Sequence, residues 1–230
     1  KRNDGYHNLE TTFQLINLFD EISFEESNKS FGFSCDGLDI EPENNLIFKS
    51  LNAITRYCNV DKGIKIHLKK IIPAGAGLGG GSSNAATTLI ALNKIWDLNL
   101  STEELVSIGK GLGADVPIFI YGKNAVATGI GDVFLDIELR KNKYLLICPD
   151  IEVSTTEMFK KLRIHEVDPK LQNSFLDTLL KEYKSIGEFY KSFVNDYDLK
   201  LSGTGSTLFI EYDNKDELEK ILQKIPKNWR

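Results

Sequence analysis

Glycine is concentrated in one short stretch of the chain. Five of the seven positions from Gly75 to Gly81 are glycine, within the longer run Pro73–Ala86. Before this run, Gly63–Lys70 alternates apolar and polar residues, which is typical of a half-buried strand. After it, the apolar residues of Ser82–Trp96 recur at steps of four, three and four, which predicts a helix. The fold must therefore connect a strand to the N-terminus of a helix through a glycine loop.

A loop of this kind favours a phosphate ligand. Glycine has no Cβ, so backbone N–H groups can approach a ligand closely, and a helix N-terminus carries about half a positive charge. Ser82 and Ser83 add hydroxyl donors or metal ligands. The alternative is a flexible turn with a serine cap, but a turn needs one or two glycines rather than five. We expect Gly80 to have a positive φ and to leave space for the phosphates.

Two familiar phosphate loops fit less well. Gly75, Gly77 and Gly80 form a GxGxxG pattern, but a dinucleotide fold requires a second strand after the helix. Here a capping box at Ser101–Glu104 predicts a second helix instead. No Gly-Lys-Ser/Thr sequence closes the run, which excludes a Walker A loop.

Charge and cysteine content exclude further classes of protein. Lys and Arg number 28 against 33 Asp and Glu, and the net charge of −5 argues against a nucleic-acid partner. Cys35, Cys58 and Cys148 lie far apart without a CxxC pair, which argues against disulfides and a zinc site and favours a reducing compartment. No run approaches about 18 apolar residues, so we expect no membrane partner and a cytoplasmic protein.

The remaining pattern predicts two domains, residues 1–142 and 143–230. The strands expected in the chain are Thr12–Leu18, Asp20–Glu26, a segment around Phe31 and Phe33, Val116–Tyr121, Ala125–Thr128, Tyr144–Cys148 and a hairpin over Leu199–Tyr212. Further helices are expected at Asn44–Cys58, from the Ser101 capping box to Gly113, and at Thr155–Leu162, Leu171–Tyr183, Ile186–Val194 and Asn214–Ile225.

Two other motifs carry polar groups that chemistry could use. In Leu112–Phe119, Asp115 stands between a glycine helix stop and an apolar segment, and we expect Pro117 to hold Val116 extended. Asp115 is then either a base that accepts a hydroxyl proton or a carboxylate that caps a loop amide. The second motif, Leu201–Leu208, holds two glycines among Ser and Thr; it is either a hairpin turn or a segment that closes a phosphate pocket.

Taken together, the glycine loop, the Asp115 motif and the late Gly-Thr-Gly-Ser turn resemble the galactokinase, homoserine kinase, mevalonate kinase and phosphomevalonate kinase superfamily. Within it, Arg2–His7, Gly79–Asn84 and Leu112–Pro117 are similar to the 4-diphosphocytidyl-2-C-methyl-D-erythritol kinase family. The resemblance implies an α+β fold with an N-terminal domain like domain 2 of ribosomal protein S5 and a ferredoxin-like C-terminal domain. It also implies transfer of a phosphoryl group from ATP, with Mg²⁺, to the 2-hydroxyl of a cytidine-diphosphate-linked methylerythritol.

The resemblance also implies roles for individual residues. Asp115 is the expected catalytic base. Phosphate binding is assigned to Pro73, Ala74, Gly75, Ala76, Gly77, Leu78, Gly79, Gly80, Gly81, Ser82 and Ser83, and the nucleoside site to Asn45, Lys70 and Asn84. Tyr6 and Phe159 are expected to stack on the cytosine, with His7 and Thr155 nearby. From the helix pattern alone, Phe159 is a core residue.

The resemblance leaves some points open. The family's catalytic lysine lies upstream of Lys1, and its closing strand lies beyond Arg230, so we expect the natural chain to be longer. Metal ligands are not assigned, and either a monomer or a homodimer is expected. The alternatives are a kinase of the same superfamily that acts on mevalonate or homoserine, and an RNA-binding module, which the net charge disfavours.

Overall fold

The computed structural model describes residues 10–28, 30–37, 41–129, 131, 133–163, 167–168 and 171–230. The chain forms two compact units. The first unit comprises Lys1–Ile72 and Gly79–Leu139, and the second comprises Pro73–Leu78 and Arg140–Arg230. The first half of the glycine loop therefore belongs to the second unit, an arrangement that the sequence did not predict.

The first unit contains a three-stranded sheet in the order β2-β4-β3. Its strands are β2 (Glu21–Ser27), β4 (Gly63–Lys69) and β3 (Phe31–Asp36). The central strand β4 runs antiparallel to β2 and parallel to β3. As its alternation predicts, β4 buries Ile64, Ile66 and Leu68 on one face.

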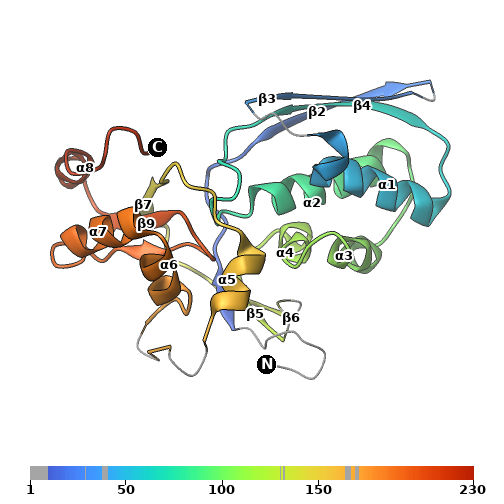
Figure 1. Cartoon of the computed structure of the whole chain (residues 1–230). Coiled ribbons are helices and arrows are strands. Elements are labelled where there is room, and N and C mark those ends of the chain that lie inside the picture. Colours follow the sequence, from blue (N-terminus) through green and yellow to red (C-terminus); the bar gives the residue numbers. More distant parts are fainter. Residues whose placement is uncertain are drawn as a thin grey trace. The chain divides into compact units, whose positions relative to one another are not determined.

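Helices lie on one face of this sheet, with α1 and α2 next to it and α3 and α4 beyond them (Figure 1). They are α1 (Leu46–Cys58), preceded by a short 3₁₀ turn at Pro42–Asn44, α2 (Gly80–Ile95), α3 (Thr102–Lys110) and α4 (Val116–Tyr121). The core between sheet and helices includes Ile54, Leu89 and Leu92, each fully buried. The predicted capping box at Ser101 and Glu104 is present at the start of α3.

A second small sheet completes the first unit. It joins β1 (Thr11–Phe13), β5 (Ala125–Thr128) and β6 (Val133–Asp136), all paired antiparallel.

In the described part of the second unit, helices pack with a three-stranded antiparallel sheet in the order β7-β9-β8 (Figure 1). The strands are β7 (Lys143–Ile147), β9 (Leu208–Tyr212) and β8 (Lys200–Leu201), and the helices are α5 (Thr155–Lys161), α6 (Leu176–Glu182), α7 (Lys184–Phe193) and α8 (Lys215–Leu222). Its core contains Met158, Leu179 and Ile186, again almost fully buried. Within the described residues, no helix has both the length and the apolar composition needed to cross a bilayer.

One predicted strand is wrong. Val116–Tyr121 is the helix α4, and Pro117 lies in its first turn instead of holding Val116 extended. Proline suits the first turn of a helix because the N–H that it lacks would have no partner there. Gly122 ends the helix with a φ of 73°, in the left-handed conformation typical of a helix stop. Hydrophobic periodicity could not distinguish a strand from a helix in so short an apolar run.

Two other predicted elements are shorter than expected. The strand expected at Thr12–Leu18 pairs only over Thr11–Phe13, and the helix expected at Leu171–Tyr183 begins at Leu176. Propensity marks suitable residues, but pairing and packing decide where an element starts.

Close packing of α3 against α4 depends on a glycine. A Cβ on Gly109 would lie 2.8 Å from Ile120 Cδ1 and 2.9 Å from Val116 Cγ1. We therefore expect Gly109→Ala to lower the free energy of unfolding by about 1–3 kcal/mol, because buried neighbours must shift. Chemical denaturation measures the change.

The control is Gly111→Ala at the end of the same helix. Gly111 has a φ of −74°, and a Cβ there would meet only the Ile108 carbonyl oxygen, at 3.4 Å. We expect a change of no more than about 1 kcal/mol. Equal losses in the two variants would contradict the packing argument.

Candidate active site

The N-terminus of α2 presents backbone N–H groups without a side-chain cap. Gly79 is the N-cap residue, in the left-handed conformation with a φ of 67°. The first helical hydrogen bond runs from Ser83 N–H to the Gly79 carbonyl at 2.9 Å, so the amides of Gly80, Gly81 and Ser82 have no acceptor within the helix. The arrangement suits an anionic ligand.

At each of the three consecutive glycines, Gly79, Gly80 and Gly81, an added side chain would meet a different neighbour. A Cβ on Gly79 would lie 2.8 Å from the Phe119 ring, and one on Gly80 would lie 2.9 Å from Ile72 Cγ2. The expectation for Gly80 is therefore wrong in two respects: its φ is not positive, and its missing side chain leaves room for protein. A Cβ on Gly81 would meet only Leu46, at an ordinary 3.5 Å, so no protein neighbour accounts for this glycine.

The first half of the loop packs against the late glycine turn within the second unit. Ser202 Oγ donates to the Gly77 carbonyl at 2.8 Å, and Thr207 N–H donates to the Ala76 carbonyl at 3.1 Å. A Cβ on Gly77 would lie 2.4 Å from the Ser202 carbonyl oxygen. The turn at Leu201–Leu208 therefore fixes the loop backbone, in addition to joining β8 and β9.

Asp115 is the N-cap residue of α4, but its side chain makes no capping hydrogen bond. Among the described helices, Asn45, Ser101, Ser154 and Asn214 all cap through their side chains. The alternative in which Asp115 caps the following amides is therefore not what the structure shows.

The surroundings of Asp115 suit proton transfer. Exclusion of water by neighbouring atoms raises the pKa of its carboxyl, although the residue keeps an exposed surface. A Cβ on Gly113, two residues earlier, would lie 3.8 Å from the Ser82 hydroxyl oxygen. Within the first unit, the Asp115 motif thus packs next to the first turn of α2.

Lys70 and Asn84, both predicted site residues, meet at a carboxylate that the sequence analysis missed. Asp20 Oδ2 lies 3.0 Å from Lys70 Nζ and accepts from Asn84 Nδ2 at 2.9 Å. Asp20 Oδ1 accepts from the Ile71 and Ile72 amides at 2.7 and 2.8 Å. Burial raises the pKa of Asp20, but these hydrogen bonds outweigh that effect and leave the pKa below its ordinary value.

A sequence signal for this cluster existed. The alternation of β4 places Lys70 in phase with Ile64, Ile66 and Leu68, and a lysine on a buried face needs an acidic partner. Extending the β2–β4 register, in which Glu21 pairs with Lys69, places Asp20 opposite Lys70.

The other predicted residues have these positions. Asn45 Oδ1 caps α1 by accepting from Ile47 N–H at 2.9 Å. In the second unit, Thr155 Oγ1 lies 3.1 Å from Thr204 Oγ1, and the Phe159 ring packs edge-to-face on Phe175 at 4.8 Å. Phe159 is half-buried and packs on another partly buried aromatic ring of the second unit. Tyr6 and His7 lie outside the described residues.

The described residues contain no group of three or more His, Cys, Asp or Glu side chains that could hold a metal ion.

Two segments of the chain match families of known proteins. Residues 45–123 match GHMP kinases N terminal domain, and residues 157–230 match GHMP kinases C terminal. The chain is also similar to proteins named 4-diphosphocytidyl-2-C-methyl-D-erythritol kinase. The one from Pseudoalteromonas translucida (strain TAC 125) is 37% identical over 240 residues, covering 100% of this chain and 84% of that protein. The one from Acinetobacter baylyi (strain ATCC 33305 / BD413 / ADP1) is 37% identical over 240 residues, covering 98% of this chain and 86% of that protein.

Solved structures of kinases are also similar to this chain. A crystal structure of 4-(cytidine 5'-diphospho)-2C-methyl-D-erythritol kinase matches with a TM-score of 0.81 at 26% identity, covering 96% of this chain and 87% of that one. A crystal structure of mevalonate kinase matches with a TM-score of 0.68 at 17% identity, covering 92% and 87%, a likeness of fold alone. The predicted α+β, two-domain kinase fold is confirmed. The chain belongs to the 4-diphosphocytidyl-2-C-methyl-D-erythritol kinase family of the GHMP kinases.

Proposed function

We propose that this protein transfers the γ-phosphoryl group of ATP to the 2-hydroxyl of 4-diphosphocytidyl-2-C-methyl-D-erythritol. The observation that carries the proposal lies within the first unit. An uncapped, glycine-built helix N-terminus packs beside a motif whose aspartate makes no capping bond and has a raised pKa. An anion site next to a carboxylate base is what phosphoryl transfer to an alcohol requires.

The phosphates of ATP are assigned to the loop Pro73–Ser83. The amides of Gly80, Gly81 and Ser82 point out of the start of α2, and the helix dipole adds to their attraction for an anion. Gly81 supports the fit, because a Cβ there would enter space that no protein atom fills apart from Leu46. Bound ATP with Mg²⁺ supplies the phosphoryl group and charge neutralisation, with Ser82 and Ser83 hydroxyls as candidate metal ligands.

Asp115 is assigned the proton transfer. Its carboxylate accepts the proton of the acceptor hydroxyl as that oxygen attacks, and it orients the hydroxyl beforehand. The raised pKa makes the Asp115 carboxylate a stronger base than an ordinary aspartate.

Recognition of the acceptor is assigned to aromatic side chains. We assign Tyr6 and Phe159 to stacking on the cytosine and His7 and Thr155 to polar contacts nearby. Base stacking on an aromatic ring contributes about 1–3 kcal/mol per base. The Phe159 ring lies edge-to-face with the Phe175 ring, with 4.8 Å between the ring centroids.

A coupled ADP-release assay tests the proposed function. We expect phosphoryl transfer to the cytidine-linked acceptor and none to mevalonate or homoserine at equal concentrations. Preferred transfer to either simple alcohol would overturn the substrate assignment. Assayed on the natural full-length protein, no ADP release with any acceptor would overturn the kinase assignment.

Gly81→Ala separates ligand binding from stability. The Cβ that this substitution adds points toward the helix N-terminus, where the phosphates are assigned. We therefore expect the affinity for ATP to fall by about tenfold or more. Stability should stay the same or rise by up to about 1 kcal/mol, because alanine is the better helix former. Titration with a fluorescent ATP analogue and thermal melting provide the two measurements.

Thr87→Ala is the matched control for Gly81→Ala, because Thr87 is an exposed position of the same helix. It should leave ATP affinity unchanged. Gly80→Ala should instead destabilise the fold, through its 2.9 Å approach to Ile72. Parental ATP affinity in a folded Gly81→Ala protein would remove the phosphates from this turn.

Asp115→Asn tests the base. The amide keeps the size of the side chain but cannot accept the proton, so kcat should fall by about 10²-fold or more while the Kd for ATP and the Tm change little. Asp97→Asn at the far end of α2 is the control, since exposed Asp97 has a φ of 54° that asparagine also tolerates. A kcat within about threefold of the parent would make Asp115 a structural residue.

The pH dependence of kcat follows from the raised pKa of Asp115. Below this pKa the carboxyl is protonated and cannot act as a base, so kcat should fall about tenfold per pH unit; above it, kcat should reach a plateau. The fall should begin at a higher pH than the ordinary Asp value of 3.8 implies. Rates at saturating ATP and acceptor, with folding checked by circular dichroism, give the profile. A flat kcat down to about pH 4 would contradict the assignment.

A further inference from the structure

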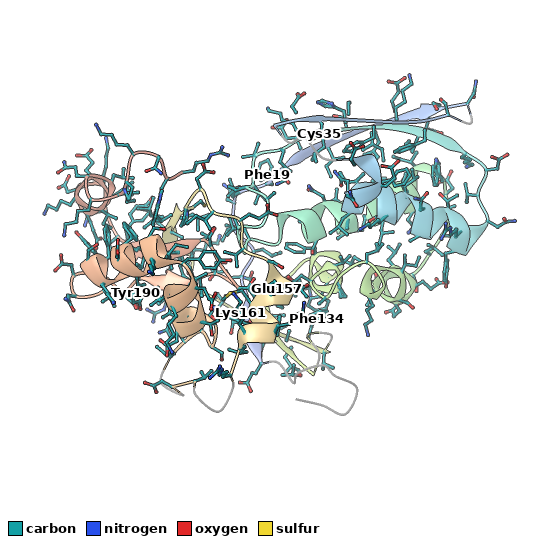
Figure 2. The ribbon with its side chains drawn as sticks, viewed as in Figure 1. Phe19, Cys35, Phe134, Glu157, Lys161 and Tyr190 are labelled. Atoms are coloured by element: carbon teal, nitrogen blue, oxygen red, sulfur yellow. The ribbon has the colours of Figure 1, made fainter. Side chains whose placement is uncertain are left out.

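A buried ion pair lies beneath the first turn of α2. The side chains of Asp20 and Lys70 are 1% and 7% exposed, and their charged atoms are 3.0 Å apart. Lys70 Nζ also donates to the Ile72 carbonyl. In Figure 2 the place is found from Phe19, the residue immediately before Asp20. Neither the proposed proton transfer nor the acceptor site uses this pair.

The pair contacts one face of α2 at two points. Asn84 donates to Asp20 at 2.9 Å, and a Cβ on Gly80 would lie 3.3 Å from Lys70 Nζ. Gly80 and Asn84 are four residues apart and therefore share a face of the helix. The cluster fixes the position and rotation of the first turn, while the amides at the end of the helix stay open to a ligand.

Stability alone does not explain a buried pair at this place. Desolvation of two charges often cancels their attraction, and apolar side chains of similar size are frequently as stabilising. One residue along both strands, Glu21 and Lys69 form an ion pair 3.4 Å apart with side chains 55% and 56% exposed. The buried Asp20–Lys70 pair differs from the exposed Glu21–Lys69 pair because it also bonds to the β4–α2 connection and to the helix.

We propose that Asp20 is a positioning residue for nucleotide binding: through Lys70, Asn84 and the Ile71 and Ile72 amides, it holds the first turn of α2 where its N–H groups meet the phosphates. The inference rests on the proposed function only in naming the ligand. The charge of Lys70 balances that of Asp20, so the carboxylate can lie close to an anion site without repelling the anion.

Asp20→Asn tests the inference. The amide places a donor against Lys70 or Asn84, both of which are donors, and breaks the cluster. We expect hydrogen exchange of the Ser83 amide, which makes the first helical hydrogen bond, to accelerate about tenfold or more, and the Kd for ATP to rise by about tenfold or more. The KM for the cytidine-linked acceptor should stay within about twofold, because that ligand is assigned elsewhere.

Glu21→Gln is the matched control, since it removes a carboxylate one residue away from an exposed pair. It should leave exchange of the Ser83 amide, the Kd for ATP and the Tm at parental values. If both variants change these quantities equally, the effect is general and the inference is wrong.

The double variant Asp20→Asn/Lys70→Met serves if Asp20→Asn does not fold, because it leaves no unpaired buried charge. It should be folded, with the same fast exchange and weak ATP binding. A folded variant with a lower Tm but parental exchange and parental Kd would make Asp20 merely structural and overturn the inference.

The two proposals fail separately. If the parent binds ATP but transfers no phosphoryl group, the proposed function fails while exchange and Kd still decide the role of Asp20. If the parent does not bind ATP, both the kinase assignment and the nucleotide-positioning role are overturned.

Discussion

The start of α2 must be packed by protein and yet keep its N–H groups free. Gly79 and Gly80 meet the first condition, because their missing side chains admit Phe119 on one side and Ile72 on the other. Gly81 meets the second, since little protein fills the space its side chain would take. A capping side chain would satisfy the amides but block a ligand, so a left-handed glycine is the N-cap that leaves them available. The Asp20–Lys70 pair contacts this helix end from the sheet side.

Support comes from two strands of the adjoining sheet, β2 and β4. Lys70 follows the last residue of β4, and Asp20 precedes the first residue of β2. The buried pair therefore lies at the end of the sheet where the glycine loop begins. A purely apolar closure would fill the same space without directional bonds to Asn84 or to the connecting amides. The cost of burying charge is therefore understandable as orientation rather than stability.

Sequence reasoning succeeded where long periodic patterns or specific motifs were present. The helix after the loop, the strand β4 and the capping box of α3 all follow from spacing that packing did not override. It failed at Val116–Tyr121, an apolar run too short for period to decide between strand and helix. It also could not assign Pro73–Leu78 to the second unit, because that depends on bonds to Ser202 and Thr207, far along the chain.

Like α2, the helix α4 begins at an N-cap residue that makes no side-chain capping bond, here an aspartate instead of a glycine. Four other described helices begin with Asn or Ser residues whose side chains cap, and α6 and α7 begin after Phe175 and Tyr183, which cannot. Asp115 is able to cap and does not, which leaves an ionisable carboxylate unused by the helix that it precedes. A capping bond would favour the charged form and lower the pKa of Asp115, whereas exclusion of water raises it. The absence of a capping bond therefore leaves the pKa of Asp115 raised, which suits the base role that we propose for it.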